Sequence, residues 1–225
     1  MLGFMGMNTM QALKLETKIK QIKSKLPFEA NCYLVFKGED AIVIDPCIAY
    51  HEIDEILKKN NLKLRAVFVT HGHIDHFYYI SEYLNFVEKL YYHPKAIEKM
   101  SDLKKSYAIL TPIKATFNEH SKTVFIKDGQ EIKLGSITVN VIYTPGHSNC
   151  SVCFLIDDAL FTGDTLFYHS VGRTDLYTGN TELLNNSLQK LKNNYPNVTI
   201  YPGHEEISTM EEEIINNPYL SEIIN

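Results

Sequence analysis

The stretch Thr70-His-Gly-His-Ile-Asp-His76 follows directly after the apolar run Ala66-Val-Phe-Val69, and it decides how the whole chain is interpreted. It places three imidazoles and a carboxylate within six residues. These groups cannot all be buried without partners, because each polar atom that leaves water needs a hydrogen bond or a ligand. A divalent metal ion supplies those partners at once. The stretch therefore predicts a metal site, with an exposed polar loop as the alternative; the candidate ligands are His71, His73, Asp75 and His76.

Three further candidate ligands each follow a predicted strand and a glycine. They are His147, Asp164 and His204, after the runs 142–146, 160–163 and 200–203. Glycine lets the backbone turn sharply and approach a site closely, so the three corners have the pattern of one device for aiming side chains at one point. Taken alone, each Pro-Gly-His is more often a turn with a solvated histidine. Together with the first stretch they give five histidines and two aspartates, enough for two metal ions that share a carboxylate.

The remaining patterns predict strands in two batches with helices between them. Strands are expected at 13–22, 31–36, 41–45, 64–70 and 90–93, and then at 124–127, 131–134, 137–143, 151–156, 159–162 and 198–201. Amphipathic patterns predict helices at 52–62, 77–87, 95–103, 181–193 and 207–215. Most of the strand runs are apolar and need cover on both faces. This order therefore predicts two sheets packed face to face, with helices outside.

Composition and charge exclude several classes of function. The chain has 22 basic and 27 acidic residues, a net charge of −5 that is spread along the sequence, so we expect no nucleic-acid partner. No apolar stretch approaches the roughly 18 residues that a membrane span needs. The start of the chain lacks the basic segment of a secretory signal, which predicts a cytoplasmic protein. Because no tract resembles a linker, we expect one domain over 1–225, frayed over 1–11.

The four cysteines predict no disulfide framework, because they are too few for a chain of this length. Cys150-Ser-Val-Cys153 has the spacing of half a zinc knot, but it lacks a second pair.

In their order along the chain, the motifs around the candidate ligands resemble those of the metallo-β-lactamase-fold superfamily. The matching stretches are Thr70 to His76, Thr144-Pro-Gly-His147, Gly163-Asp164-Thr165 and Pro202-Gly-His204. The resemblance extends from about Leu13 to Ile207 and implies an α/β fold, the αβ/βα four-layer sandwich, with the site at one edge. It also implies that Asp45 lies close to the metals and orients a ligand.

The same resemblance implies a division of the ligands between two metal ions. One ion would be held by His71, His73 and His147, and the other by Asp75, His76 and His204. Asp164 would bridge them. Imidazole and carboxylate donors without thiolates leave the identity of the metal open, and we expect zinc, with iron or manganese as alternatives.

Within the superfamily, the chain looks most like the glyoxalase II group of thioester hydrolases and its shorter bacterial relatives. The motifs that carry this are Asn31-Cys-Tyr-Leu34 and Val171-Gly-Arg-Thr-Asp-Leu176. The second motif implies that Arg173 contacts the thiol half of the substrate, since a guanidinium suits a carboxylate or amide oxygen. The alternative is a surface turn in which Arg173 pairs with Asp175. Only 21 residues follow His204, so we expect no helical domain of the kind that completes the glutathione site in full-length glyoxalase II.

The chain departs from the family pattern beside several candidate ligands. Aromatic residues follow His76 where relatives commonly have small ones, and Asn149-Cys150 stands where relatives often have Pro-Gly. Cys47 and His169 are also unusual near motif positions. Each of these is either a pocket-lining group or an incidental side chain.

The resemblance to the glyoxalase II group implies hydrolysis of thioesters, with S-acyl-glutathione or a related acyl-thiol as the small-molecule substrate. Two divalent metals lower the pKa of a shared water and polarise a carbonyl oxygen, and we expect Asp75 and Asp164 to be catalytic. No general acid is needed, because a thiol with a pKa near 8.5 is a good leaving group. The alternatives are lactone or β-lactam hydrolysis, a protein whose metals are structural, and persulfide dioxygenation. For the last, the resemblance implies a single iron held by His71, His147 and Asp164.

Overall fold

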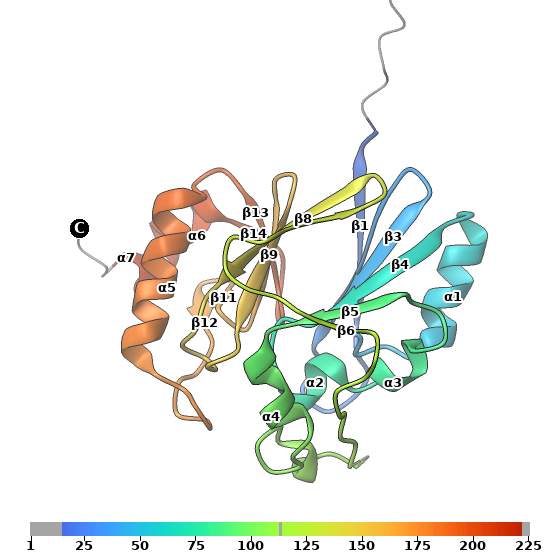
Figure 1. Cartoon of the computed structure of the whole chain (residues 1–225). Coiled ribbons are helices and arrows are strands. Elements are labelled where there is room, and N and C mark those ends of the chain that lie inside the picture. Colours follow the sequence, from blue (N-terminus) through green and yellow to red (C-terminus); the bar gives the residue numbers. More distant parts are fainter. Residues whose placement is uncertain (1–14, 113, 222–225) are drawn as a thin grey trace, which may run out of the picture.

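The computed structural model describes residues 15–112 and 114–221, in which two six-stranded sheets lie face to face with helices on their outer sides (Figure 1). This four-layer arrangement confirms the predicted sandwich. Every predicted strand has a counterpart in the structure, with its ends shifted by a few residues. The part of the first strand predicted before Leu15, and the predicted fraying over 1–11, lie outside the described residues.

The first sheet combines antiparallel and parallel pairing. Its order is β1 (Thr17–Lys23), β2 (Asn31–Lys37), β3 (Asp40–Ile44), β4 (Lys63–Phe68), β5 (Lys89–Tyr92) and β6 (Thr123–Phe125). The first three strands are antiparallel and the last four run parallel. Because parallel strands end at the same edge, the chain after β3 and the chain after β4 leave the sheet side by side.

The second sheet is antiparallel except for one parallel pair. Its order is β14 (Ser208–Thr209), β13 (Thr199–Pro202), β10 (Ala159–Gly163), β9 (Val152–Ile156), β8 (Ile137–Tyr143) and β7 (Glu131–Leu134). The parallel pair is β10 with β13, so the glycine corners that end these two strands lie together. A short hairpin of β11 (Leu166–Phe167) and β12 (Ser170–Val171) follows β10 and was missed from the sequence.

The core has three layers, which explains why strands such as β2 are apolar on both faces. Tyr33 and Val35 point into the layer between the sheets, while Cys32 and Leu34 point into the layer beneath the helices. All four side chains are buried. A sheet covered on both sides needs apolar residues at successive positions rather than at alternate ones.

The helices cover the outer face of each sheet. The first sheet carries α1 (Tyr50–Lys59), α2 (Ile74–Phe77), α3 (Ile80–Tyr83), the 3-10 turn η1 (Pro94–Ala96), α4 (Ile97–Met100) and the 3-10 turn η2 (Ala108–Leu110). The second carries α5 (Thr181–Asn194), α6 (Met210–Asn216) and α7 (Pro218–Ser221). The side chain of Asn180 begins α5 by accepting a hydrogen bond from the Leu183 backbone N–H, as N-cap residues do.

The predicted helix over 77–87 is wrong as a single element. It is divided between α2 and α3, because the backbone leaves helical geometry at Tyr79 (φ −103°, ψ 12°). The Tyr79 N–H donates to the carbonyl of Pro46, 3.0 Å away, instead of to a carbonyl one turn earlier. A contact with a distant segment of the chain therefore overrides the local periodicity.

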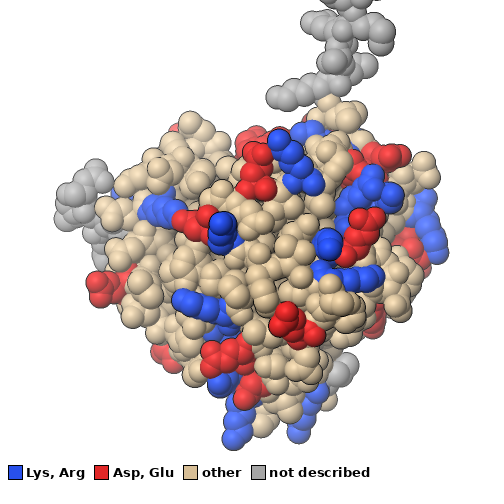
Figure 2. Space-filling model, viewed as in Figure 1, with Lys and Arg blue, Asp and Glu red and all other residues tan. Residues whose placement is uncertain are grey.

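Three further features concern the helices, the cysteines and the surface charges. Among the described residues, no helix combines the length and apolarity that crossing a membrane requires. The four cysteines are free and buried. Figure 2 shows acidic and basic side chains interspersed over the visible face, without a field of one sign.

Candidate metal centre

The seven candidate ligands come from the ends of strands in both sheets. His71 and His73 lie in the loop between β4 and α2, and Asp75 and His76 lie in α2 itself. His147 follows β8, Asp164 follows β10 and His204 follows β13. The side chains of His71, His73, His76, His147 and Asp164 are buried, and those of Asp75 and His204 are partly buried. The structure therefore brings all seven side chains to one place, and their role as metal ligands stays a prediction.

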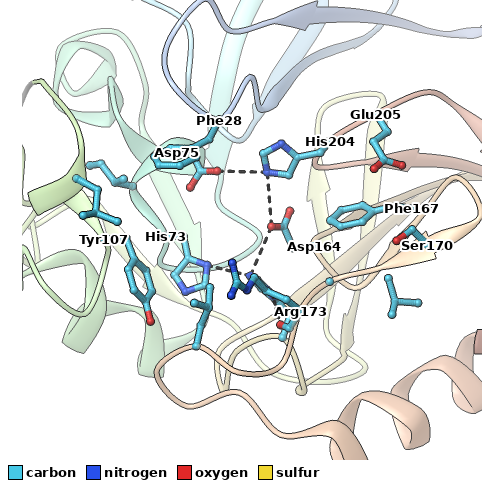
Figure 3. A pocket seen from close by; sticks show the side chains of 16 residues that line it. Phe28, His73, Asp75, Tyr107, Asp164, Phe167, Ser170, Arg173, His204 and Glu205 are labelled. Carbon is cyan, nitrogen blue, oxygen red and sulfur yellow. Dashed lines mark hydrogen bonds and ion pairs between the residues drawn. The ribbon is translucent and has the colours of Figure 1, made fainter.

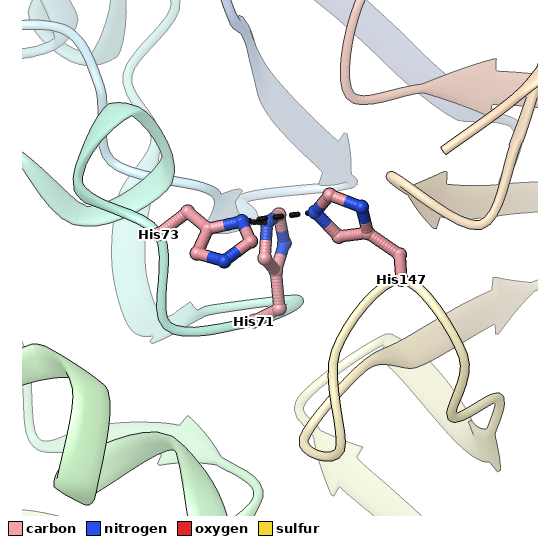
Figure 4. A group of neighbouring side chains, drawn as sticks. All are labelled: His71, His73 and His147. Atoms are coloured by element: carbon pink, nitrogen blue, oxygen red, sulfur yellow. Dashed lines mark hydrogen bonds between the residues drawn. The ribbon is translucent and has the colours of Figure 1, made fainter. Parts of the chain in front are cut away.

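Three imidazoles from the two sheets form the first group, His71, His73 and His147 (Figure 4). The Nδ1 atom of His73 lies 3.0 Å from His71 Nε2 and 2.9 Å from His147 Nε2. Nitrogen ligands on a tetrahedral zinc ion, each at about 2.0–2.1 Å, are separated by roughly 3.3 Å. The spacing of the three nitrogens is close to that of ligands around one ion.

Hydrogen bonds to the Nδ1 atoms of His71 and His147 leave the Nε2 lone pairs of both rings directed toward the centre of this group. His147 Nδ1 lies 2.8 Å from the carbonyl of Arg173, so it must carry a proton, and its Nε2 is left as an acceptor. His71 Nδ1 lies 3.1 Å from the Thr70 hydroxyl, which itself donates to Asp45 and can therefore only accept from His71. Two lone pairs thus face His73 Nδ1, and a single proton there can satisfy only one of them. A cation satisfies both.

The second group consists of Asp75, His76 and His204. The Oδ2 atom of Asp75 lies 3.2 Å from His204 Nε2 and 3.6 Å from His76 Nε2. Figure 3 shows Asp75 and Asp164 on either side of the His204 ring, with their carboxylates turned toward its nitrogen. Two donors from α2 and the imidazole of His204, which follows β13, therefore converge at a second point.

Asp164 lies between the two groups. Its Oδ2 atom is 3.5 Å from His147 Nε2, 3.9 Å from His71 Nε2 and 3.6 Å from His204 Nε2. Its Oδ1 atom is 3.2 Å from His76 Nε2. One carboxylate is thus within 4 Å of imidazoles from both groups, which is the arrangement that a bridging ligand requires.

Orphaned polar atoms test whether a metal fits here. His73 Nε2, His76 Nε2 and Asp164 Oδ1 are buried and have no hydrogen-bond partner within the described part of the chain. The last two atoms are 3.2 Å apart but lack hydrogen-bond geometry. Unsatisfied buried groups are costly and rare, and those at His76 and Asp164 face the centre of the cluster. The donor set therefore fits divalent metal ions.

Asp45 organises ligands from both groups. Its Oδ2 atom accepts from His76 Nδ1 at 2.8 Å and from the Thr70 hydroxyl at 2.7 Å, and its Oδ1 atom accepts from the Thr70 N–H at 2.8 Å. Through Thr70 the same carboxylate also orients His71. The structure shows that Asp45 holds the candidate ligand His76, as expected, and that His76 binds a metal stays a prediction. The relay through Thr70 was missed, although Thr70 opens the quoted motif.

Burial and charge give the histidines opposite protonation states in the metal-free protein. Burial lowers the pKa of His71, His73 and His147, to about 3 for His73. For His76 and His204 burial acts in the same direction, but Asp164 and Asp75 outweigh it. The pKa of His204 rises to about 10, and that of His76 rises well above its usual value. The first group is therefore neutral near pH 7, which is the state in which imidazole binds metal.

Close backbone approach explains one of the glycine corners. A Cβ atom on Gly203 would overlap Asp164 Oδ1 and would stand 2.7 Å from His76 Cε1. Only glycine lets the end of β13 lie against these two side chains, as the sequence pattern predicted.

A pocket of about 480 Å³ opens above the cluster. Its floor includes His73, Asp75, His147, Asp164 and His204. Arg173 also lines it, but its Nε and Nη2 atoms each lie 2.6 Å from a carboxylate oxygen of Asp175. The pairing that the sequence offered as the alternative is thus present, and a contact of Arg173 with substrate stays a prediction.

The other unusual residues lie outside this pocket. Cys47 Sγ donates to the carbonyl of Ala30 at 3.4 Å, and His169 Nε2 lies 2.7 Å from Glu212. Asn149 Oδ1 accepts from the Nζ of Lys99, 2.5 Å away, on the buried side of the loop that carries His147. No sequence pattern marks this lysine, because it lies in the short helix α4 without a motif.

The comparison with known families agrees with this geometry. Residues 26–204 match the metallo-beta-lactamase superfamily. The chain belongs to this superfamily. Its relatives there include the probable metallo-hydrolase YqgX of Bacillus subtilis, 28% identical over 200 residues that cover 87% of this chain and 94% of that protein. An uncharacterised protein of Mycobacterium tuberculosis is 37% identical over 208 residues, covering 84% of this chain and 92% of that protein.

A third relative is the hydroxyacylglutathione hydrolase of Francisella tularensis subsp. novicida. It is 35% identical over 176 residues, which cover 77% of this chain and 62% of that protein. The match therefore spans less than two thirds of the hydrolase.

Solved structures of the superfamily share the fold closely. BLEG-1, a B3 metallo-beta-lactamase, has a TM-score of 0.83 at 28% identity, covering 91% of this chain and 100% of that one. TTHA1623 in a di-iron-bound form has a TM-score of 0.74 at 28% identity, with coverages of 89% and 100%. ETHE1 from Myxococcus xanthus has a TM-score of 0.70 at 25% identity, with coverages of 89% and 83%.

Proposed function

We propose that the chain is a metal-dependent hydrolase that cleaves thioesters, either S-acyl-glutathione or a related acyl-thiol, with two divalent ions as cofactors. The observation that carries the proposal is the pair of three-donor groups joined by Asp164 at the floor of an open pocket. The likeness to a hydroxyacylglutathione hydrolase supports thioesters as the substrate class.

The candidate ligands form one set for each ion. His71, His73 and His147 would hold one ion and Asp75, His76 and His204 the other, with Asp164 shared. When bound, the ions lower the pKa of a shared water and polarise the substrate carbonyl. Zinc, iron and manganese all suit imidazole and carboxylate donors, and zinc is our first choice.

Asp75 and Asp164 also have a role toward the water. Both line the pocket, and an ionised carboxylate only accepts hydrogen bonds. Each would accept a hydrogen bond from the attacking water, which turns a lone pair of the water oxygen toward the thioester carbon. The thiolate leaves without a general acid, because the pKa of a thiol is near 8.5.

Two other reactions have specific support and belong in the same test. The fold of ETHE1 is similar, and Asp164, His71 and His147 would supply the single iron site that we expect of a persulfide dioxygenase. The likeness to BLEG-1 makes lactone or β-lactam hydrolysis the other alternative.

Metal analysis and substrate assays on the purified full chain separate these functions. We expect close to two ions per chain, and thioester hydrolysis that a chelator removes and that zinc, iron or manganese restores. One iron per chain with oxygen uptake on glutathione persulfide would replace the proposal with the dioxygenase. Turnover of a lactone or β-lactam without thioester turnover would also overturn it.

Asp164→Ala tests the shared ligand. Because this carboxylate is within 4 Å of imidazoles in both groups, we expect the variant to lose metal from both and to lose at least about a hundredfold in kcat. Elemental analysis and thioester turnover check this, with His169→Ala as the control from outside the pocket. Normal metal content and turnover in Asp164→Ala would contradict the bridging role.

A further inference from the structure

Exposed apolar side chains surround the mouth of the pocket above the metal centre. Leu110 is 66% exposed and Phe28 is 50% exposed, and both line the pocket. The partly exposed Tyr107 and Leu176 and the buried Phe167 complete this apolar rim. Figure 3 shows the rings of Phe28, Tyr107 and Phe167 spaced around the carboxylates and imidazoles. When a ligand covers an apolar hollow that is open to water, the free energy falls because apolar surface is removed from water.

The backbone holds these side chains at the rim. Phe28 and Glu29 have φ values of 84° and 42°, in the left-handed region that residues other than glycine rarely adopt. Tyr107 is also left-handed (φ 64°), and its hydroxyl accepts from the Tyr177 N–H at 2.8 Å. Such strain persists where the surrounding structure enforces it, often at ligand sites. The loop backbone therefore holds Phe28 and Tyr107 at the rim.

The charges that line the pocket do not suit a substrate with several carboxylates. Among the described lining residues, Arg173 is the single lysine or arginine, and Asp175 already binds its guanidinium. Outside the candidate metal ligands, the one acidic side chain among the described lining residues is that of Glu205. The thiol of glutathione carries two carboxylates, so each would need a cation that the rim does not offer.

We propose that the preferred substrates are thioesters with an uncharged, apolar acyl group, either an aliphatic chain of medium length or an aromatic ring, on a thiol that lacks the carboxylates of glutathione. This inference rests on the proposed thioester hydrolase. The acyl group would lie against Phe28, Leu110 and Phe167, with the carbonyl over the metal centre.

A matrix of substrates tests the inference on the metal-loaded full chain. Acetyl, hexanoyl, benzoyl and lactoyl groups are each presented on N-acetylcysteamine and on glutathione, and kcat/KM is corrected for spontaneous hydrolysis. We expect hexanoyl- and benzoyl-N-acetylcysteamine to exceed lactoylglutathione at least tenfold. Equal or better turnover of lactoylglutathione overturns the inference but leaves the proposed function intact. If the metal-loaded chain hydrolyses none of these thioesters, the proposed function fails together with the inference.

Rim variants locate the preference. We expect Leu110→Asp to lower kcat/KM for the hexanoyl thioester at least fivefold more than for the acetyl one. Ile215→Asp is the matched control, because Ile215 is 65% exposed but lies on α6, outside the pocket. Phe28→Ser gives an independent second test from another loop. Equal losses on both substrates in Leu110→Asp and Phe28→Ser, or an equal effect of Ile215→Asp, would overturn the role of the rim.

Discussion

At the scale of single residues, Asp45 controls the orientation of two candidate ligands although it lies outside the seven. Its carboxylate accepts from His76 directly and from Thr70, which in turn accepts from His71. We expect Asp45→Asn to weaken metal binding by roughly tenfold to a hundredfold, because the amide presents a donor where His76 also donates. Competition with a metal indicator measures this, and Asp158→Asn is the control at an exposed aspartate. Unchanged affinity would show that the orientation of His76 does not depend on this bond.

In the exposed pair of Arg173 and Asp175, we expect substitution of the two residues to change KM in opposite directions. Asp175→Ala frees the guanidinium, so we expect the KM for glutathione thioesters to fall by about threefold, the modest effect of an exposed charge. Arg173→Ala should raise that KM by a similar factor of about three with metal content unchanged, because its carbonyl rather than its side chain contacts His147. Steady-state kinetics and elemental analysis check both. A rise in KM in Asp175→Ala would mean that the pair acts as a unit.

The candidate ligands could be predicted from the sequence because each one follows an apolar strand. A polar side chain at such a position is seldom explained by packing alone. Asp45 was predictable for the same reason, since it follows β3 at a recognisable position. Phe28, Leu110 and Lys99 were not predictable. They lie in a loop, a 3-10 turn and the short helix α4, which are too short or irregular to show a period. Only the folded chain shows that Phe28 and Leu110 line the pocket and that Lys99 contacts Asn149.

At the scale of elements, the hairpin β11–β12 positions His147 through Gly172, the residue that directly follows β12. A Cβ atom on Gly172 would overlap the carbonyl of Asp164 and would stand 3.0 Å from His147 Nδ1. We expect Gly172→Ala to push the chain away, to destabilise the fold by about 1–3 kcal/mol and to weaken metal binding. Urea unfolding and metal titration measure the two effects. Arg173→Ala is the control, one residue further on, and equal behaviour of the two variants would contradict this packing argument.

Elements were predictable where burial and periodicity agree. Runs such as Asn31–Lys37 and Ile137–Tyr143 each have a neighbouring strand on both sides, and their apolar content marks them as strands. The hairpin β11–β12 has two residues in each strand, too few for any period to show. The division of the helix at Tyr79 depends on Pro46, more than thirty residues earlier, and local patterns carry no such information.

At the scale of the whole molecule, the metal centre exists only because the two sheets pack together. His71 and His73 leave the first sheet, while His147, Asp164 and His204 leave the second. Each predicted ion would therefore join side chains of both sheets, and metal binding would stabilise the sandwich as a whole. The order of motifs along the sequence predicted that side chains of both sheets come together, because the candidate ligands follow strands of both batches.

The electrostatics of the whole site predict that the two groups respond differently to pH. Near pH 7, His71, His73 and His147 are neutral, since burial has lowered their pKa values, whereas His204, with a pKa of about 10, carries a proton. An ion that enters the second group must displace that proton. Its affinity should therefore rise by about tenfold per pH unit and per displaced proton between pH 7 and 9, while the first group changes little.

Calorimetric titration in two buffers of different ionisation enthalpy measures these protons directly. We expect one ion to bind with little proton release and a second to release one or more protons, so that the second ion is lost first as the pH falls. His204→Gln should lower the proton count of the second step by about one, because it removes the group whose pKa is raised to about 10. If both ions bound with the same dependence on pH, the two groups would not have the opposite protonation states that Asp75 and Asp164 impose on His204 and burial imposes on His73.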